Sequence, residues 1–206
     1  MDLARQIQFN TVLDVGCGNG ALLDTFRQSF KAELTGIDVS SYVIAENAKG
    51  RKDCRFRQLD ISQGALDEKF DLVVCSEVLE HIEDQHSALS NLRKMCAQYL
   101  ILTVPREPMF PLDRQFGHVR HYTEETVQTL LKSHGIVPVF VRNWGFPFHT
   151  LYKHLINLRP GASMSRFAQQ EYGPLERFTS VVLRLLFYLN LGRGGLQIVC
   201  LGRVGE

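Results

Sequence analysis

Short apolar runs alternate along the chain with longer segments of helical periodicity. The short runs, of which the first is rich in β-branched residues, predict strands over residues 11–15, 33–39, 54–60, 69–76, 98–105, 136–144 and 196–204. Between them, apolar residues recur every three or four positions, which predicts helices over residues 21–30, 40–50, 78–97, a stretch after Thr123, and most of 146–192. Such alternation indicates βαβ units. We therefore predict an α/β fold with a doubly wound, mostly parallel sheet covered on both faces.

Two segments are longer than ordinary connections between strands and helices. Residues 105–122 are expected to form an active-site loop, because long loops inside compact domains tend to be functional. Residues 145–195 separate the last two strands and are expected to be a helical insertion that sets substrate specificity. The length of 206 residues favours a single domain over residues 1–206.

Charge and cysteine content narrow the class of protein. Residues 1–102 hold 11 Lys and Arg against 15 Asp and Glu, whereas residues 103–206 hold 12 against 7. The positive second half suits an anionic partner, with chance variation as the alternative. The five cysteines include no C-x-x-C pair, which argues against a disulfide framework or a zinc cage. No signal peptide or membrane span is predicted, since "VVLRLLFYLNLG" is too short and polar, so we expect a cytoplasmic protein.

Three glycines follow the first predicted strand in "VLDVGCGNG". Glycine reaches positive φ angles and lets a ligand approach the main chain. In a doubly wound sheet this turn lies in the ligand crevice at the carboxyl ends of the strands. The spacing of Gly16, Gly18 and Gly20 is G-x-G-x-G and departs from the dinucleotide pattern G-x-G-x-x-G. A nicotinamide-dependent oxidoreductase is therefore the less favoured alternative.

Acidic residues follow the second and third predicted strands. Asp38 can accept hydrogen bonds from a ribose diol, Asp60 can accept from an exocyclic amine such as that of adenine, and Val39 offers an apolar surface to the ring. Each acid alone is better explained as a solvated loop residue or a helix cap. Together with Asp14, three acids at three successive strand ends indicate a nucleoside-like ligand.

Five stretches together resemble the class I S-adenosylmethionine-dependent methyltransferases: "VLDVGCGNG", "LTGIDVS", "FRQLDIS", "FDLVVCSEVLEHIED" and "YLILTVPRE". The resemblance covers about residues 11–105. It implies a seven-stranded Rossmann-like sheet with an antiparallel last strand, and S-adenosyl-L-methionine as cofactor. The cofactor contacts that it implies are, from the methionine end to the adenine, Asp14, Gly16, Gly18, Gly20, Ser76, Asp38, Val39, Asp60 and the Ile61 main chain. Family members usually carry a helical segment before the first strand, whereas ten residues precede Thr11 here. We therefore expect another part of the chain to close the site, or a truncated chain.

The stretch "SEVLEHIED" carries the candidate catalytic chemistry. If it is helical, Glu77, Glu80, His81 and Asp84 share one face. The expected catalytic set is His81 as a general base with Glu77, joined by His118 and His121 from the loop. A solvated surface is one alternative, and a divalent metal held by Glu77, Glu80, His81 and His118 is another. The E-x-x-E-H spacing resembles that of small-RNA 3′-end 2′-O-methyltransferases and ubiquinone-pathway O-methyltransferases, both of which use a metal.

The insertion is expected to hold the methyl acceptor. Its candidate pocket aromatics are Phe146, Phe148, Tyr152, Phe167 and Tyr172. An apolar helical stripe is predicted to join the core, with a lipid or membrane contact as the alternative: Leu175, Phe178, Val182, Leu185, Leu186 and Leu189. We expect methyl transfer to a small-molecule acceptor at oxygen, anionic or sugar-like, and no nucleic-acid partner. The alternatives are a metal-assisted RNA 2′-O-methyltransferase and a catalytically silent cofactor-binding subunit.

Overall fold

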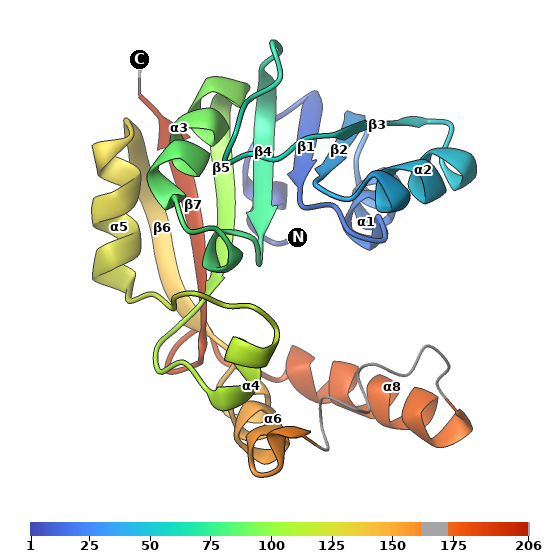
Figure 1. Cartoon of the computed structure of the whole chain (residues 1–206), viewed down its shortest axis with the longest axis vertical. Coiled ribbons are helices and arrows are strands. Elements are labelled where there is room, and N and C mark those ends of the chain that lie inside the picture. Colours follow the sequence, from blue (N-terminus) through green and yellow to red (C-terminus); the bar gives the residue numbers. More distant parts are fainter. Residues whose placement is uncertain (162–172, 206) are drawn as a thin grey trace.

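The computed structural model describes residues 1–161 and 173–205, and the side chains of residues 174–177 are left aside. Within these residues, seven strands form one sheet in the order β3-β2-β1-β4-β5-β7-β6 (Figure 1). The strand bounds are β1 Thr11–Val15, β2 Glu33–Asp38, β3 Cys54–Gln58, β4 Phe70–Ser76, β5 Cys96–Pro105, β6 Ile136–Trp144 and β7 Gln197–Val204. β7 runs antiparallel to both of its neighbours, and the other pairs are parallel. The predicted doubly wound sheet with an antiparallel last strand is confirmed.

Helices cover both faces of the sheet, as predicted. One core lies between the sheet and the helices α3 (Gln85–Met95) and α5 (Glu124–Ser133), and the other lies beneath α1 (Ala21–Ser29). The adjacent residues Val12 and Leu13 of β1 enter opposite cores, because successive side chains of a strand point to opposite faces. The carboxyl ends of the parallel strands therefore meet at one edge between two packed layers.

Side chains cap the starts of two helices. The Ser40 hydroxyl accepts a hydrogen bond from the amide of Val43 at 3.3 Å, at the start of α2 (Ser41–Gly50). The Thr123 hydroxyl accepts from the amide of Thr126 at 3.1 Å, at the start of α5. Both caps are local signals, because the donor lies three residues from the acceptor.

The predicted helix over residues 78–97 is wrong in its first half. The chain forms a short 3-10 turn, η2 (Leu79–His81), becomes extended at Ile82, and enters α3 only at Gln85. Asp84 is the N-cap of α3, and its carboxylate accepts from the amide of Ser87 at 3.0 Å. Glu77, Glu80, His81 and Asp84 therefore do not share one helix face.

The segment after β5 also differs from the prediction of an irregular loop. It contains a short helix, α4 (Pro111–Gln115).

The first ten residues contain one 3-10 turn, η1 (Ala4–Gln6). The five cysteines are free thiols. Among the described residues, no helix combines the length and apolarity that crossing a membrane requires.

The insertion between β6 and β7 contains α6 (Phe148–Asn157) and α8 (Pro174–Tyr188), and α8 extends away from the sheet (Figure 1). The prediction that its apolar stripe joins the core is wrong. Phe178 and Leu185 are 66% and 61% exposed, because α8 packs on α6 through Phe187 and Tyr152, whose rings lie 5.8 Å apart. Val182 and Leu189 are exposed and Leu186 is half-buried, whereas the Leu175 side chain lies outside the described residues.

Candidate active site

The turn after β1 favours glycine at three positions because of its backbone conformation. Gly16, Gly18 and Gly20 adopt φ angles of 71°, 47° and 76°, in the left-handed region. A Cβ on Gly16 would also lie only 2.5 Å from a methyl group of Val78. The Asn47 side-chain amide donates to the carbonyl of Gly18 at 2.7 Å, so α2 holds the turn against the sheet. The loop therefore presents bare main chain at the strand ends.

A cavity of about 600 Å³ opens beside this turn, which is a typical size for a small-molecule site. All of its lining residues lie between positions 15 and 84. They include Gly16, Asp38, Val39, Asp60, Ile61, Glu77 and His81 from the predicted site. The cavity brings these residues together, while Asp14, Gly18, Gly20 and Ser76 lie outside its lining.

The Asp38 carboxylate is held by main-chain amides at the cavity wall. One oxygen accepts from the amide of Gly18 at 3.0 Å and the other from the amide of Ser40 at 2.9 Å. Asp60, which lies two residues beyond the end of β3, accepts from the amide of Ser62 at 2.8 Å. Both carboxylates have lone pairs to spare, because a carboxylate oxygen can accept more than one hydrogen bond. Donors on a ribose or an adenine would therefore find acceptors that are already oriented.

Asp14 is a buried acid with an unpartnered oxygen. The residue is 3% exposed, and its Oδ2 has no hydrogen-bond partner among the described residues. The pKa of Asp14 is raised to about 7, mainly by burial and to a smaller extent by the negative charge of Asp38. A cationic ligand nearby would favour the ionised form of this carboxyl group.

Glu77 is positioned by two strands that lie far from it in the sequence. Its φ angle of 55° is unusual for a residue other than glycine and marks a constrained position. Its Oε1 accepts from the hydroxyl of Thr103 at 3.1 Å and from the side-chain amide of Gln197. Ser76 shares the same Thr103 hydroxyl at 2.7 Å. Desolvation raises the pKa of Glu77, although part of the residue remains exposed to solvent, whereas Glu80 is buried.

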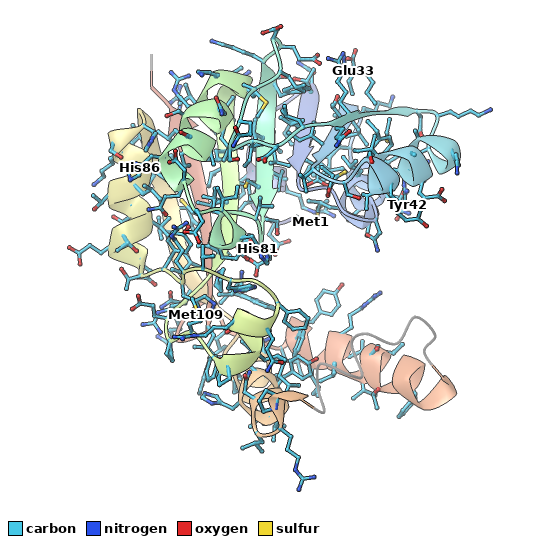
Figure 2. The ribbon with its side chains drawn as sticks, viewed as in Figure 1. Met1, Glu33, Tyr42, His81, His86 and Met109 are labelled. Atoms are coloured by element: carbon cyan, nitrogen blue, oxygen red, sulfur yellow. The ribbon has the colours of Figure 1, made fainter. Side chains whose placement is uncertain are left out.

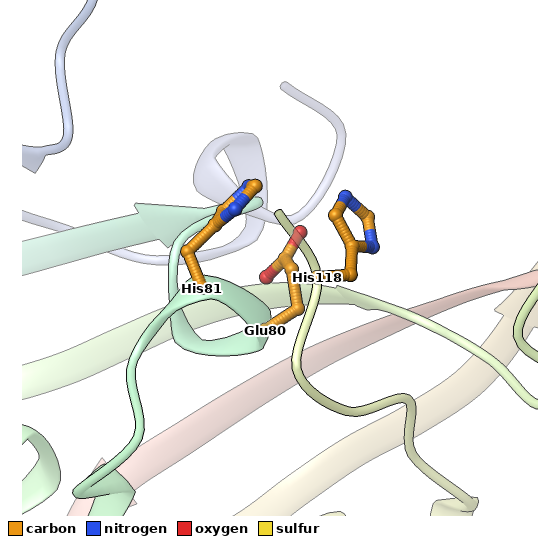
Figure 3. Close-up of side chains that lie close together, drawn as sticks. All are labelled: Glu80, His81 and His118. Carbon is orange, nitrogen blue, oxygen red and sulfur yellow. The ribbon is translucent and has the colours of Figure 1, made fainter. Parts of the chain in front are cut away.

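Glu80 is fully buried and forms no ion pair with another described residue. Neither of its carboxylate oxygens has a hydrogen-bond partner among the described residues. Burial and then the charge of Glu77 raise the pKa of Glu80 to about 8. Figure 3 shows its carboxylate between the rings of His81 and His118, and the ligand atoms of these three residues lie within 4.8 Å of one another.

His118 and His121 form a chain that fixes the protonation of both rings. Nδ1 of His121 lies 3.2 Å from the carbonyl of Arg106, which only accepts, so this nitrogen carries the proton. Burial lowers the pKa of His121, so its Nε2 offers a lone pair to Nδ1 of His118 at 3.0 Å. Burial is the main cause and the charge of His81 the second cause that lower the pKa of His118 to about 4. His118 is therefore neutral at pH 7, with a lone pair on Nε2.

Asp113 completes this second cluster and was missed in the sequence. Its Oδ1 pairs with Lys153 of α6 at 3.1 Å, and its Oδ2 lies 3.5 Å from Nε2 of His121. The only local signal is that Asp113 caps α4, where its Oδ2 accepts from the amide of Phe110 at 3.0 Å. Figure 2 shows His81 near the end of β4, on the same side of the sheet as Met109 in the segment before α4.

Three of the predicted acceptor-pocket aromatics belong to the described residues, and none of these three lines the cavity. Tyr152 instead packs against Phe187, and Phe146 is 46% exposed at the edge of the insertion. Phe148 begins α6, where its amide donates to the side chain of Asn190 at 2.8 Å. Phe167 and Tyr172 lie outside the described residues.

The strand order, the antiparallel β7, the glycine turn and the acid-lined cavity define a Rossmann-like class I methyltransferase architecture. A family model described as "Methyltransferase domain" matches residues 2–165. The chain belongs to this family, that of the class I S-adenosylmethionine-dependent methyltransferases, as the resemblance implied. Membership in this family decides against the nicotinamide-dependent oxidoreductase.

Curated relatives match about half of the chain. A ubiquinone biosynthesis O-methyltransferase from Pseudomonas entomophila is 34% identical over 106 residues, which is 47% of this chain and 45% of the relative. A trans-aconitate 2-methyltransferase from Escherichia coli is 27% identical over 60% of this chain and 51% of the relative. The chain thus spans about half the length of the relatives it matches.

Solved structures match the whole architecture at low identity. The N-methyltransferase NodS from Bradyrhizobium japonicum, in complex with S-adenosyl-L-homocysteine, is 22% identical with a TM-score of 0.61, over 98% of this chain and 82% of that chain. A putative sarcosine dimethylglycine methyltransferase from Galdieria sulphuraria is 13% identical with a TM-score of 0.67 over the same shares. Identities at this level support the fold alone.

Proposed function

We propose that this chain transfers the methyl group of S-adenosyl-L-methionine to an oxygen of a small-molecule acceptor. The histidine pair beside the cavity carries the proposal. His81 lines the cavity, and its ring centre lies 4.7 Å from that of His118. A base is needed only where the nucleophile starts protonated, as a hydroxyl does. The name of the O-methyltransferase relative supports the same acceptor atom.

In this reaction the acceptor oxygen attacks the methyl carbon and the carbon–sulfur bond breaks. The sulfur keeps the bonding pair and becomes the neutral thioether of S-adenosyl-L-homocysteine. The protein's task is to align the oxygen with the methyl group and to exclude water. We assign the hydroxyl proton to His81, since it lines the cavity, while neutral His118 supplies a second lone pair beside it. The expected methionine-end contacts of the cofactor are the glycine turn, Asp14 and Ser76, with Asp38 on the ribose and Asp60 and Ile61 on the adenine.

The acceptor is proposed to be anionic or sugar-like. The second half of the chain carries 12 Lys and Arg against 7 Asp and Glu, which favours a carboxylated or phosphorylated molecule. The trans-aconitate 2-methyltransferase among the relatives bears a name that is consistent with a carboxylated acceptor.

Cation-assisted transfer is a second candidate, and the orphaned Glu80 favours it. Glu80 offers a buried carboxylate whose two oxygens have no hydrogen-bond partner in the described part of the chain. Together with His81 and the lone pair of His118, it fits a divalent cation with oxygen and nitrogen ligands. When bound, such an ion lowers the pKa of a hydroxyl that it contacts. This mode would also serve an RNA 2′-hydroxyl, so short RNA belongs in the panel of acceptors to be tested.

The test combines binding and turnover. Calorimetry should show that the wild-type chain and His81→Ala bind S-adenosyl-L-homocysteine equally, because this ring is assigned to the acceptor. With an acceptor found in a panel of hydroxylated acids, sugars and short RNA, His81→Ala should lower kcat by about 10²–10⁴-fold. His134→Ala is the matched control, because His134 is the C-cap of α5 and belongs to neither cluster. Full turnover in the double variant His81→Ala, His118→Ala would disprove the catalytic assignment and leave the cofactor assignment intact.

A further inference from the structure

The insertion displays most of the exposed apolar side chains of the described residues. Of the large hydrophobic residues that are exposed there, eleven lie between positions 146 and 191. Five of them lie on α8 and the sixth is its C-cap: Phe178, Val181, Val182, Leu185, Tyr188 and Leu189. Their spacing of three and four residues puts all six on one face of the helix, which we call the α8 face. Leu151, Leu155 and Leu158 repeat the pattern on and just after α6, and they are 56%, 55% and 75% exposed. Exposed apolar faces of this extent mark interaction sites.

Among the described side chains of the insertion, the charges are of one sign. Arg159, Arg184 and Arg193 are exposed, and none of them pairs with an acid in the described part of the chain. The described side chains of residues 145–195 include no acid, and the whole segment holds six Lys and Arg against two Glu. A partner that covers the apolar face therefore meets positive charge at its rim.

We propose that the α8 face binds the surface of an anionic lipid membrane. A 15-residue helix is about 22 Å long, and one apolar face flanked by arginine is the form of helix that lies in the plane of a membrane surface. Tyr188, which is 80% exposed, has the apolar ring and polar hydroxyl that suit the headgroup boundary. Anionic headgroups supply the negative charge that the three arginines lack within the described chain.

A second copy of the chain is the less suitable occupant. Two copies joined by a two-fold axis through the α8 face would bring the same arginine-flanked surfaces together. Like charges placed opposite one another oppose association, whereas an anionic membrane satisfies the apolar and the basic parts at once. Figure 1 also shows α6 and α8 on the side of the sheet where the parallel strands end, so a membrane-bound α8 face would hold the active site near the lipid surface.

The test is co-sedimentation with phosphatidylcholine vesicles, with and without phosphatidylglycerol, at low and high salt. The wild-type chain should bind the anionic vesicles and release them at high salt. Leu185→Ser with Leu189→Ser should weaken binding by at least about ten-fold, because two apolar side chains leave the lipid boundary. Arg184→Gln with Arg193→Gln should weaken it by about five-fold per charge on anionic vesicles only.

Val137→Ser with Val139→Ser is the matched control, since these valines are 56% and 61% exposed on β6, outside the insertion. Equal calorimetric affinity for S-adenosyl-L-homocysteine shows that each variant is folded, and vesicle binding is measured without turnover, so it stands apart from the proposed reaction. The proposal is overturned if no vesicle binds, if neutral and anionic vesicles bind equally, or if the control weakens binding as much as the leucine pair. Sedimentation that shows a dimer dispersed by the leucine pair would instead identify a second copy as the occupant.

Discussion

Replacing Glu80 with glutamine tests the electrostatics of the acid–histidine cluster directly. Glu80 has an ordinary pKa of 4.5 and a pKa of about 8 in the folded chain. Between these values the folded chain holds a proton that the unfolded chain has lost, so the free energy of unfolding falls as the pH rises from 4.5 to about 8. The full difference corresponds to at most about 5 kcal/mol, and relaxation with water entry brings the expected value to about 2–3 kcal/mol.

Glu80→Gln keeps the shape of the side chain and removes the titration. The free energy of unfolding is measured in urea at a series of pH values. Between acidic pH and pH above 8, the difference between the variant and the wild-type chain should shift by about 2–3 kcal/mol in favour of the variant. Asp14, whose pKa is also raised by burial, contributes the same slope to both proteins and cancels in the difference. Glu83→Gln is the matched control, because Glu83 lies three residues away with a side chain that is 84% exposed. A stability difference that stays flat across this pH range would refute the burial argument.

The same pair of proteins tests the cation-assisted mode. A divalent cation that binds the ionised Glu80 carboxylate stabilises only the folded wild-type chain. At a free concentration one hundred times the dissociation constant, the gain is about 2.7 kcal/mol. Mg²⁺ or Mn²⁺ titrations at pH 8 should therefore raise the unfolding free energy of the wild-type chain and leave that of Glu80→Gln unchanged. If both proteins are stabilised equally, the cation does not bind through the Glu80 carboxylate.

Three further substitutions test the cofactor side of the site. Asp38→Ala should lose about 1.5–3 kcal/mol of S-adenosyl-L-homocysteine affinity by calorimetry, since a charged acceptor is removed, and an unchanged affinity would contradict its ribose role. Gly16→Ala should lower the free energy of unfolding in urea by about 1–3 kcal/mol, because the new Cβ would lie 2.5 Å from Val78 and the residue has a φ of 71°. Gly64→Ala is the control and should be near neutral, because its Cβ would lie 3.9 Å from the nearest atom. In the wild-type chain, the ratio of the affinity for S-adenosyl-L-methionine to that for S-adenosyl-L-homocysteine should increase as the pH rises through about 7. The reason is that the Asp14 carboxyl group ionises in this range and attracts the sulfonium. Asp14→Asn should lose this pH dependence, and its persistence would assign the titration to another group.

Features that depend on a few neighbouring residues could be predicted from the sequence. The apolar run of β1 and the glycines after it identify a strand that ends in a ligand-facing turn. Ser40 and Thr123 are recognisable caps because each accepts from an amide only three residues away. The carboxylates of Asp38 and Asp60 reach one cavity because parallel strands end at the same edge of the sheet.

Periodicity was misleading where distant residues decide the local structure. Residues 78–97 have helical spacing throughout, yet Glu77 is tied to Thr103 and Gln197, which lie 26 and 120 residues away. These contacts hold the chain in a turn before Asp84 can cap α3. Periodicity also identified an apolar face on α8, but the spacing of residues carries no information about what covers that face.

The burial of Glu80 shows why the acid–histidine cluster lies where the helix prediction is wrong. In a helix, the spacing of Glu77 and Glu80 would place both carboxylates on a solvated face. In the 3-10 turn, Glu80 is buried instead, and the amide of Val119 donates to its carbonyl at 2.8 Å. That hydrogen bond pins the segment between β5 and α5 over the turn and brings His118 to the carboxylate. The site thus arises from a break in local regularity that long-range contacts maintain, and this is where functional residues are expected to depart from sequence-based rules.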